Sequence, residues 1–227
     1  IEVGNIRRNS LKEIWNNRDP GPITAFLRKR VEELMLSQFG KNPPLPVIML
    51  LDSARERLTA AARVQAELVS EGWEIFAKPE KGFEISDLNG MRITGAIDRI
   101  DRNRSTGAFR IIDYKTSDGA TKPEAAHFCK ASDSTTTISR FEVGGKECEW
   151  MDIQLPVYRM LLDASRDFKD AGEIQLAYFC LPKAVGETGV YMWEDFSDQL
   201  LKAAGKCAGA IIAAVRSFKF WPPAEGD

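Results

Sequence analysis

The pattern of apolar positions changes along the chain from a helical period to a strand period. Between residues 23 and 39 the apolar side chains recur every three or four positions after Pro22, which predicts an amphipathic helix. The proline-rich stretch 42–46 should break this helix, and a second helix, ended by Gly72, is expected over residues 52–71. The first third of the chain is therefore expected to be helical.

From residue 73 onward, apolar and polar positions alternate in the manner of β-strands. Asn89-Gly90 and the segment 105–107 are turn signals between these alternating runs. The alternation predicts an antiparallel meander of strands over residues 73–78, 82–86, 91–101 and 108–115.

The second half of the chain begins with a segment that lacks steady periodicity. Residues 116–149 are rich in Ser, Thr, Gly and charge, and we expect a functional or mobile loop with partial disorder. The elements expected after it are a helix over 153–168 capped by Asp152, strands over 173–181 and 189–193, and a final helix over 197–218, closed by Trp221 and two prolines.

This order of elements predicts one α/β domain with a central mixed sheet flanked by helices. Within the single domain 1–227, residues 1–72 would form a helical lead-in and residues 73–227 the core. The length of 227 residues, with 44% hydrophobic and 28% charged residues, suits one sizeable core. No apolar run is long enough to span a bilayer, so we expect no membrane segment.

Charge and cysteine usage narrow the classes of function. The net charge of −2 means that any nucleic-acid site must be a local basic patch. The four cysteines are widely spaced and the chain has a single histidine, His127, which argues against a zinc site. Scattered thiols and a start without a signal-peptide core predict a cytoplasmic protein, and the absent initiator Met suggests a segment of a longer polypeptide.

The candidate chemistry lies on two of the predicted strands. Alternation places Asp113 and Lys115 on one strand face, roughly 6.6 Å apart along the backbone. Asp98 of the preceding strand points away from the apolar side of Ile97, and strand pairing can bring it close to Asp113. Two carboxylates within a sheet repel unless a cation lies between them, and oxygen ligands favour Mg²⁺ or Mn²⁺. Taken alone, Asp113 and Lys115 also fit a solvated strand edge.

Four separated motifs then point to a known family. Their order along the chain is Glu80, the segment 95–101 (GAIDRID), the segment 112–116 (IDYKT) and the segment 154–158 (QLPVY). Together they resemble the nuclease domain of the PD-(D/E)XK superfamily, in particular the RecB-like and AddB-like branch attached to helicases in bacterial recombination. The resemblance covers roughly residues 71–162 and implies a restriction-endonuclease-like core.

The resemblance also implies roles for individual residues. Asp98 and Asp113 would ligate the metal, with the Tyr114 carbonyl as a further ligand. Lys115 would orient the attacking water or stabilise the pentavalent phosphorane. Glu80 matches the acidic residue of the earlier strand, as a catalytic residue and metal ligand.

Three further residues have less settled roles. Glu84 competes with Glu80 for the position of the upstream acid. Gln154 and Tyr158, four residues apart on one helical face, match the Q-x-x-x-Y element that supports the active site and contacts DNA.

Two features depart from the family pattern. Many relatives carry a histidine in the early helices as an extra metal ligand, whereas His127 follows the motif lysine and is expected to be a loop residue. AddB-like members hold an iron–sulfur cluster on one upstream and three closely spaced downstream cysteines. This chain lacks that spacing, so no such cluster is expected in it.

The resemblance implies a Mg²⁺-dependent deoxyribonuclease in recombination and double-strand-break repair. Its expected substrate is single-stranded DNA ends, delivered by a helicase of the same polypeptide or complex. Two alternatives remain open at this point. One is a nuclease-fold DNA-binding or structural module without catalysis, and the other is a stand-alone exonuclease of the CRISPR or phage type.

Several other side chains have both a functional and a structural interpretation. Trp150 could stack on bases, although packing is the more common role of a tryptophan. Arg99, Asp101 and Arg102 are expected to be strand-end surface charges or sheet salt bridges. Basic residues of the early helices could line a strand channel or form a solvated face; they are Arg28, Lys29, Arg30, Arg55, Arg57 and Arg63.

Overall fold

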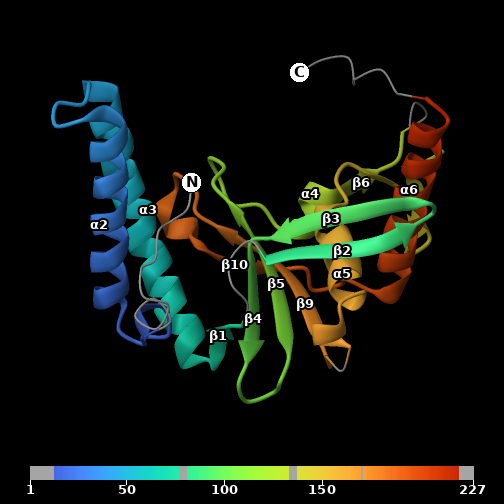
Figure 1. The fold of residues 1–227 in the computed structure, drawn as a ribbon, viewed down its shortest axis with the longest axis horizontal. Coiled ribbons are helices and arrows are strands. Elements are labelled where there is room, and N and C mark those ends of the chain that lie inside the picture. Colours follow the sequence, from blue (N-terminus) through green and yellow to red (C-terminus); the bar gives the residue numbers. More distant parts are fainter. Residues whose placement is uncertain (1–12, 77–80, 133–136, 170, 220–227) are drawn as a thin grey trace.

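The structure of the chain is a computed structural model, and it describes residues 13–76, 81–132, 137–169 and 171–219 (Figure 1). The helices are α2 (Pro20–Phe39), α3 (Leu45–Ser70), α4 (Pro123–His127), α5 (Gln154–Asp163) and α6 (Asp198–Arg216), with short 3₁₀ turns at Arg166–Phe168 and Val185–Glu187. The strands are β1 (Trp73–Ile75), β2 (Lys81–Leu88), β3 (Met91–Ile97), β4 (Arg99–Asn103), β5 (Phe109–Lys115), β6 (Phe128–Lys130), β7 (Arg140–Val143), β8 (Lys146–Trp150), β9 (Ile174–Cys180) and β10 (Gly189–Met192).

A five-stranded mixed sheet forms the centre of the fold, in the order β1-β4-β5-β9-β10. Strands β5 and β9 are parallel, and the other neighbouring strands are antiparallel. This arrangement confirms the predicted α/β fold with a central mixed sheet flanked by helices.

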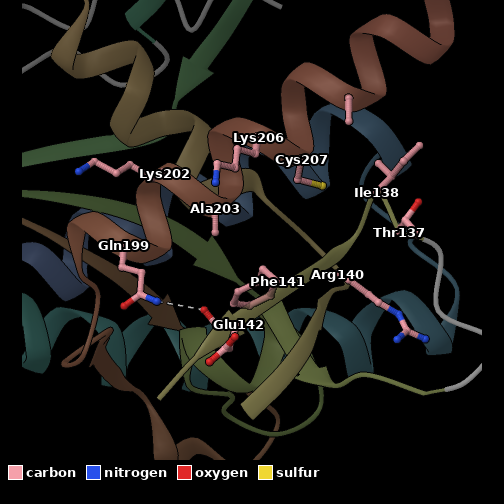
Figure 2. Close-up of a pocket in the computed structure, with 11 residues that line it drawn as sticks. Thr137, Ile138, Arg140, Phe141, Glu142, Gln199, Lys202, Ala203, Lys206 and Cys207 are labelled. Atoms are coloured by element: carbon pink, nitrogen blue, oxygen red, sulfur yellow. Dashed lines mark hydrogen bonds between the residues drawn. The ribbon is translucent and has the colours of Figure 1, made fainter. Parts of the chain in front are cut away.

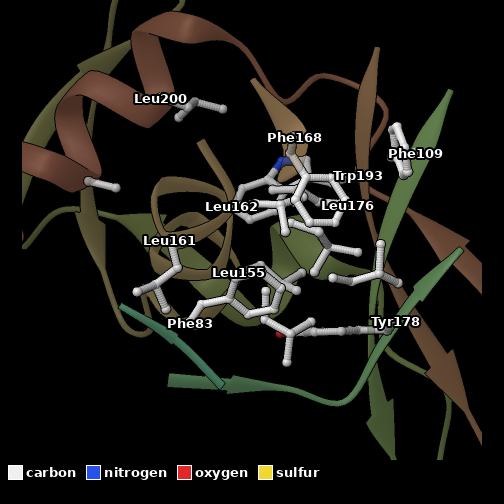
Figure 3. Close-up of a cluster of buried hydrophobic side chains, with 14 of the residues drawn as sticks. Phe83, Phe109, Leu155, Leu161, Leu162, Phe168, Leu176, Tyr178, Trp193 and Leu200 are labelled. Carbon is white, nitrogen blue, oxygen red and sulfur yellow. The ribbon is translucent and has the colours of Figure 1, made fainter. Parts of the chain in front are cut away.

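The two faces of strand β5 pack against different helices, as alternation requires. Phe109 and Ile111 join a cluster with Leu155 and Leu161 of α5 (Figure 3). Ile112 lies on the opposite face, in a cluster that includes residues of α3. The central sheet is therefore covered on both faces, and the residues that precede Asp113 anchor β5 firmly.

Strands β2 and β3 form a separate two-stranded hairpin. Its turn is Asn89-Gly90, where both residues have positive φ angles of 52° and 80°, as a tight hairpin turn requires. The predicted strand over 91–101 is wrong as one element, because β3 ends at Ile97 and β4 begins at Arg99. Strand β3 pairs with β2, whereas β4 pairs with β1 and β5, so the chain changes sheets at Asp98.

Helix α3 begins earlier than predicted, at Leu45 rather than residue 52. The proline-rich stretch separates α2 from α3, as predicted. Pro46 itself lies within α3, which tolerates it because a backbone N–H in the first turn has no helical partner to lose. The first turns also carry exposed apolar residues, among them Leu45 and Leu50, which are 68% and 69% exposed. None of the helices in the described part of the chain is both long and apolar enough to cross a membrane.

The expectation of an irregular loop over residues 116–149 is wrong for about half of its length. The segment holds α4 and most of an antiparallel three-stranded sheet in the order β6-β8-β7. Gly144 and Gly145, with φ angles of 58° and 73°, join β7 to β8 in a tight turn. Phe141 and Trp150 stack across this sheet at 4.3 Å between ring centroids, so Trp150 is a core residue.

The later elements follow the prediction, except that α5 ends at Asp163, about five residues before the predicted end. Helix α5 starts at Gln154 with Ile153 at the N-cap position, and the predicted cap, Asp152, accepts a 2.7 Å hydrogen bond from the Gln154 amide. Ser197 caps α6 by accepting a hydrogen bond from the Leu200 amide. The predicted closure at Trp221 lies outside the described residues.

Candidate active site

Asp98 lies at the junction between the β2–β3 hairpin and the central sheet. The next residue, Arg99, is paired with Ile112 in the β4–β5 register, which brings Asp98 next to Asp113. A carboxylate oxygen of Asp98, Oδ2, accepts a 3.1 Å hydrogen bond from the Tyr114 amide. Strand pairing therefore brings the two predicted carboxylates together.

Asp113 is the most enclosed acidic residue of this group, with 4% of the residue exposed. Its Oδ2 atom lies 2.6 Å from Lys115 Nζ and, beyond that ion pair, has no hydrogen-bond partner among the described residues. Burial raises the pKa of Asp113, the Lys115 ammonium opposes this rise, and the negative charges of Asp98 and Asp152 add to it. The ionised carboxylate is thus incompletely stabilised by the protein alone.

Lys115 connects the strand carboxylate to helix α5. Its Nζ atom lies 3.1 Å from Gln154 Oε1, to which it donates a hydrogen bond. The Gln154 amide nitrogen in turn donates a 3.0 Å hydrogen bond to the Tyr158 hydroxyl. The side chain of Lys115 is 30% exposed, so its ammonium is fixed on one side and can contact a substrate on the other.

Gly95 of strand β3 allows α5 to approach the site. A Cβ atom at this position would lie 2.7 Å from Leu161 Cδ1 and 3.8 Å from Tyr158 Cε1. The first distance is shorter than a carbon–carbon contact permits, and Leu161 is fully buried. The glycine of the GAIDRID motif is therefore required for the helix that carries Gln154 to pack against β3.

Two residues, Glu80 and Glu84, compete for the role of the upstream acid, and the structure describes only Glu84. Glu80 lies outside the described residues, so its role stays a prediction. Glu84 faces Thr94 in the β2–β3 register, and its carboxylate contacts Arg92 at 3.5 Å and the Ser86 hydroxyl at 3.2 Å. Glu84 is therefore engaged along the hairpin, by contacts that include neither Asp98 nor Asp113.

The neighbouring charges behave as a sheet salt bridge rather than as surface groups. Arg99 donates two 2.7 Å hydrogen bonds to Asp101, one from Nε and one from Nη2. Their side chains are only 3% and 0% exposed. Arg99 also donates to the Tyr114 hydroxyl at 3.3 Å, so this pair supports the strand that carries the site.

The basic residues of the early helices mostly form local contacts on a helix surface. Arg55 pairs with Glu32 and Asp52, and Arg30 pairs with Glu33. Arg57 differs, since it donates long hydrogen bonds to the carbonyl oxygens of Thr116 and Leu181. These contacts show a largely solvated face, with Arg57 tied to the ends of β5 and β9.

The prediction that His127 is a loop residue is wrong, because it ends helix α4 and is completely buried. Its Nε2 atom lies 2.9 Å from the Tyr178 hydroxyl, and its Nδ1 atom lies 2.8 Å from the Asp152 carbonyl oxygen. The sequence singles out His127 as its one histidine but does not indicate its contact with Tyr178, because the two residues are 51 positions apart and share no local motif.

A pocket of about 740 Å³ lies between strand β7 and helix α6, and Figure 2 shows Arg140, Lys202 and Lys206 among its lining residues. Neither carboxylate of the candidate site lines this pocket, and nor does Lys115. The candidate site is thus at the end of β5 and separate from this hollow.

The site fits a hard divalent cation in its donor chemistry, although the ligand set is incomplete in the described part of the chain. No cluster of three or more histidine, cysteine or acidic residues suited to a metal occurs among the described residues. Two carboxylates meet, and the unsatisfied, enclosed oxygen of Asp113 is the kind of group that a cation stabilises. The four cysteines are free thiols.

Comparison with known proteins agrees with this geometry. A family model described as the PD-(D/E)XK nuclease superfamily matches residues 3–224 of the 227. No curated protein matches the chain. The family match spans every residue of the candidate site.

Proposed function

The chain belongs to the PD-(D/E)XK nuclease superfamily, and from that premise we propose that it hydrolyses phosphodiester bonds of DNA with a divalent metal ion. The observation that carries this proposal is the meeting of Asp98, Asp113 and Lys115 at the end of β5, with Lys115 2.6 Å from Asp113. An acidic pair that can hold a metal ion, beside a held ammonium, suits phosphodiester hydrolysis, because both the ion and the ammonium can stabilise negative charge on the phosphate.

Mg²⁺ or Mn²⁺ would be held by Asp98 and Asp113, with the Tyr114 carbonyl and Glu80 as further ligands. When bound, such an ion supplies positive charge to the phosphate and lowers the pKa of an attacking water. Burial raises the pKa of Asp113 and repulsion by Asp98 adds to the rise, and the same charge would offset both effects.

Lys115 is the group that this chain offers to the reacting atoms. Its ammonium has hydrogen atoms to donate and is partly exposed, so it can orient the water oxygen or neutralise charge that develops on the phosphate. The Gln154 side chain fixes Lys115, and the Tyr158 hydroxyl fixes Gln154. Preorganised donors of this kind lower the barrier because they need little rearrangement during the reaction.

The proposed substrate is a single-stranded DNA end, which the protein would degrade as an exonuclease during recombination and double-strand-break repair. A helicase of the same polypeptide or complex would deliver this end. The motif order that resembles the RecB-like and AddB-like branch supports this part of the proposal. The presence of Asp98, Asp113 and Lys115 in one place argues against a module that has lost catalysis.

Digestion of end-labelled single- and double-stranded DNA with Mg²⁺ or Mn²⁺ tests the proposal. We expect the wild type to degrade DNA and the variants Asp113→Ala and Lys115→Ala to lose this activity. Lys169→Ala is the matched control, because Lys169 is exposed and precedes β9 at the opposite end of the sheet from Lys115.

Isothermal titration calorimetry with Mg²⁺ or Mn²⁺ separates metal binding from cleavage. Asp113→Ala should abolish the binding, whereas Lys115→Ala should retain it. A folded wild type that binds metal and leaves both DNA forms intact would contradict catalysis and favour a DNA-binding module.

A further inference from the structure

Tyr178 lies directly beside the candidate site, in the centre of strand β9. It is paired with Asp113 in the parallel β5–β9 register and is 1% exposed. Lys115 Nζ lies 4.7 Å from the centroid of its ring, within the distance at which an ammonium is attracted to an aromatic face. The ring therefore provides a third contact for Lys115, besides Asp113 and Gln154.

The hydroxyl of Tyr178 is held from behind by His127. The Asp152 carbonyl oxygen, 2.8 Å from His127 Nδ1, can only accept, so Nδ1 carries the proton in the neutral ring. His127 Nε2 is then an acceptor, and the Tyr178 hydroxyl donates to it at 2.9 Å. Burial lowers the pKa of His127 and raises the pKa of Tyr178, so both groups stay neutral and the hydrogen bonds keep this direction.

The plane of the His127 ring is also fixed by packing. It stacks on Trp193 with 4.8 Å between the ring centroids and 16° between the planes. Trp193 and Tyr178 both belong to the main core cluster. His127 is thus held by Trp193 and by the Asp152 carbonyl oxygen, and Tyr178 by His127 and the core cluster.

A buried tyrosine–histidine pair is not needed to fill a core, since apolar residues of similar volume avoid the cost of burying polar atoms. This pair lies instead behind the face that Lys115 contacts. The lysine side chain is a flexible stem with a compact charge, and its other two contacts leave one side of the ammonium free to move. The aromatic face limits that movement.

We propose that Tyr178, held in place by His127, is a positioning residue that fixes the Lys115 ammonium at the active site through its aromatic face. The effect of this positioning on catalysis rests on the proposed nuclease function. The restraint of the Lys115 side chain by the Tyr178 ring does not depend on cleavage and can be tested separately.

A substitution of Tyr178 with a conservative rescue tests the catalytic meaning. Tyr178→Leu removes the ring and should lower kcat for DNA cleavage about tenfold with little change in KM, as expected for the loss of a partly desolvated cation–π contact. Tyr178→Phe keeps the ring and should restore most of that loss. Equal losses in the leucine and phenylalanine variants would overturn the proposal.

A second measurement reads the position of Lys115 without cleavage. Folded protein is briefly labelled with acetic anhydride, and modification at each lysine is measured by mass spectrometry, with the exposed Lys169 as internal reference. The labelling rate of Lys115 relative to Lys169 should rise several-fold in Tyr178→Leu and stay near the wild-type value in Tyr178→Phe. An unchanged ratio in the leucine variant would refute the restraint, whatever the outcome of the nuclease assay.

Discussion

Replacing Asp101 by asparagine removes one charge from an ion pair that the central sheet encloses. Arg99 and Asp101 are joined by two 2.7 Å hydrogen bonds and are 3% and 0% exposed. The substitution preserves the size and shape of the side chain. Its effect on stability therefore reports mainly the lost charge.

The magnitude follows from the burial of Arg99. A guanidinium stays charged under ordinary conditions, so Asp101→Asn leaves a buried cation whose hydrogen-bond acceptors, an amide oxygen and the Tyr114 hydroxyl at 3.3 Å, carry no negative charge. Breaking one side of a buried pair costs about 3–5 kcal/mol, a large part of the roughly 5–15 kcal/mol that stabilises a typical domain. At about 2–4 °C per kcal/mol for a chain of this size, Tm should fall by ~6–20 °C.

Urea denaturation followed by circular dichroism measures the change in the free energy of unfolding, and a thermal melt measures the change in Tm. Glu74→Gln is the matched control, because the Arg104–Glu74 pair has a similar distance of 2.9 Å but side chains that are 56% and 22% exposed. An exposed pair contributes at most about 1 kcal/mol. The reasoning is refuted if Asp101→Asn destabilises the protein no more than Glu74→Gln does.

Three further predictions concern the site and its support. Gly95→Ala should destabilise the protein by about 1–3 kcal/mol through its clash with the buried Leu161, whereas Gly82→Ala, whose Cβ would meet nothing within 4 Å, is the control in the same urea titration. Because burial raises the pKa of Asp113, the stability that its protonated carboxyl contributes is present at low pH and is lost as pH rises through the folded-state pKa. Asp113→Asn should therefore raise Tm in EDTA at neutral pH and remove any Tm increase on adding Mg²⁺. A lower Tm of this variant in EDTA would contradict the reasoning. Because burial lowers the pKa of His127 from 6.5, the unfolded chain binds the proton first, so stability should be full above pH ~6.5 and fall below it. The decline of Tm between pH ~6.5 and 5 should be smaller in His127→Gln, and an equal decline in both proteins would argue against this origin.

The parts of the site that the sequence predicts correctly are those that depend on local pairing. Alternation along β5 places Asp113 and Lys115 on one face, and a short turn after β4 brings Asp98 next to Asp113. The β4–β5 register confirms this juxtaposition. The family motif then leads to Gln154, whose contact with Lys115 no short-range pattern could predict.

The parts that the sequence does not predict depend on partners far apart in the chain. The apolar positions shift by one residue at Asp98-Arg99, between Ile97 and Ile100, but only the pairing of β3 with β2 and of β4 with β5 shows that this shift is a change of sheet. The β7–β8 hairpin had a usable signal in Gly144-Gly145, which the polar composition of its surroundings concealed.

The change of sheet at Asp98 has a mechanical consequence. The two proposed metal ligands lie on different sheets, since Asp113 lies within the central sheet and Asp98 follows the β2–β3 hairpin. Asp98 directly follows the last strand of the hairpin. The turn at the other end of the hairpin is held by a 3.0 Å hydrogen bond from Arg216 to the Asn89 carbonyl oxygen. A shift of the hairpin tip relative to the central sheet would therefore change the gap between the two carboxylates, and Arg216 at the C-terminal end of α6 restrains that tip.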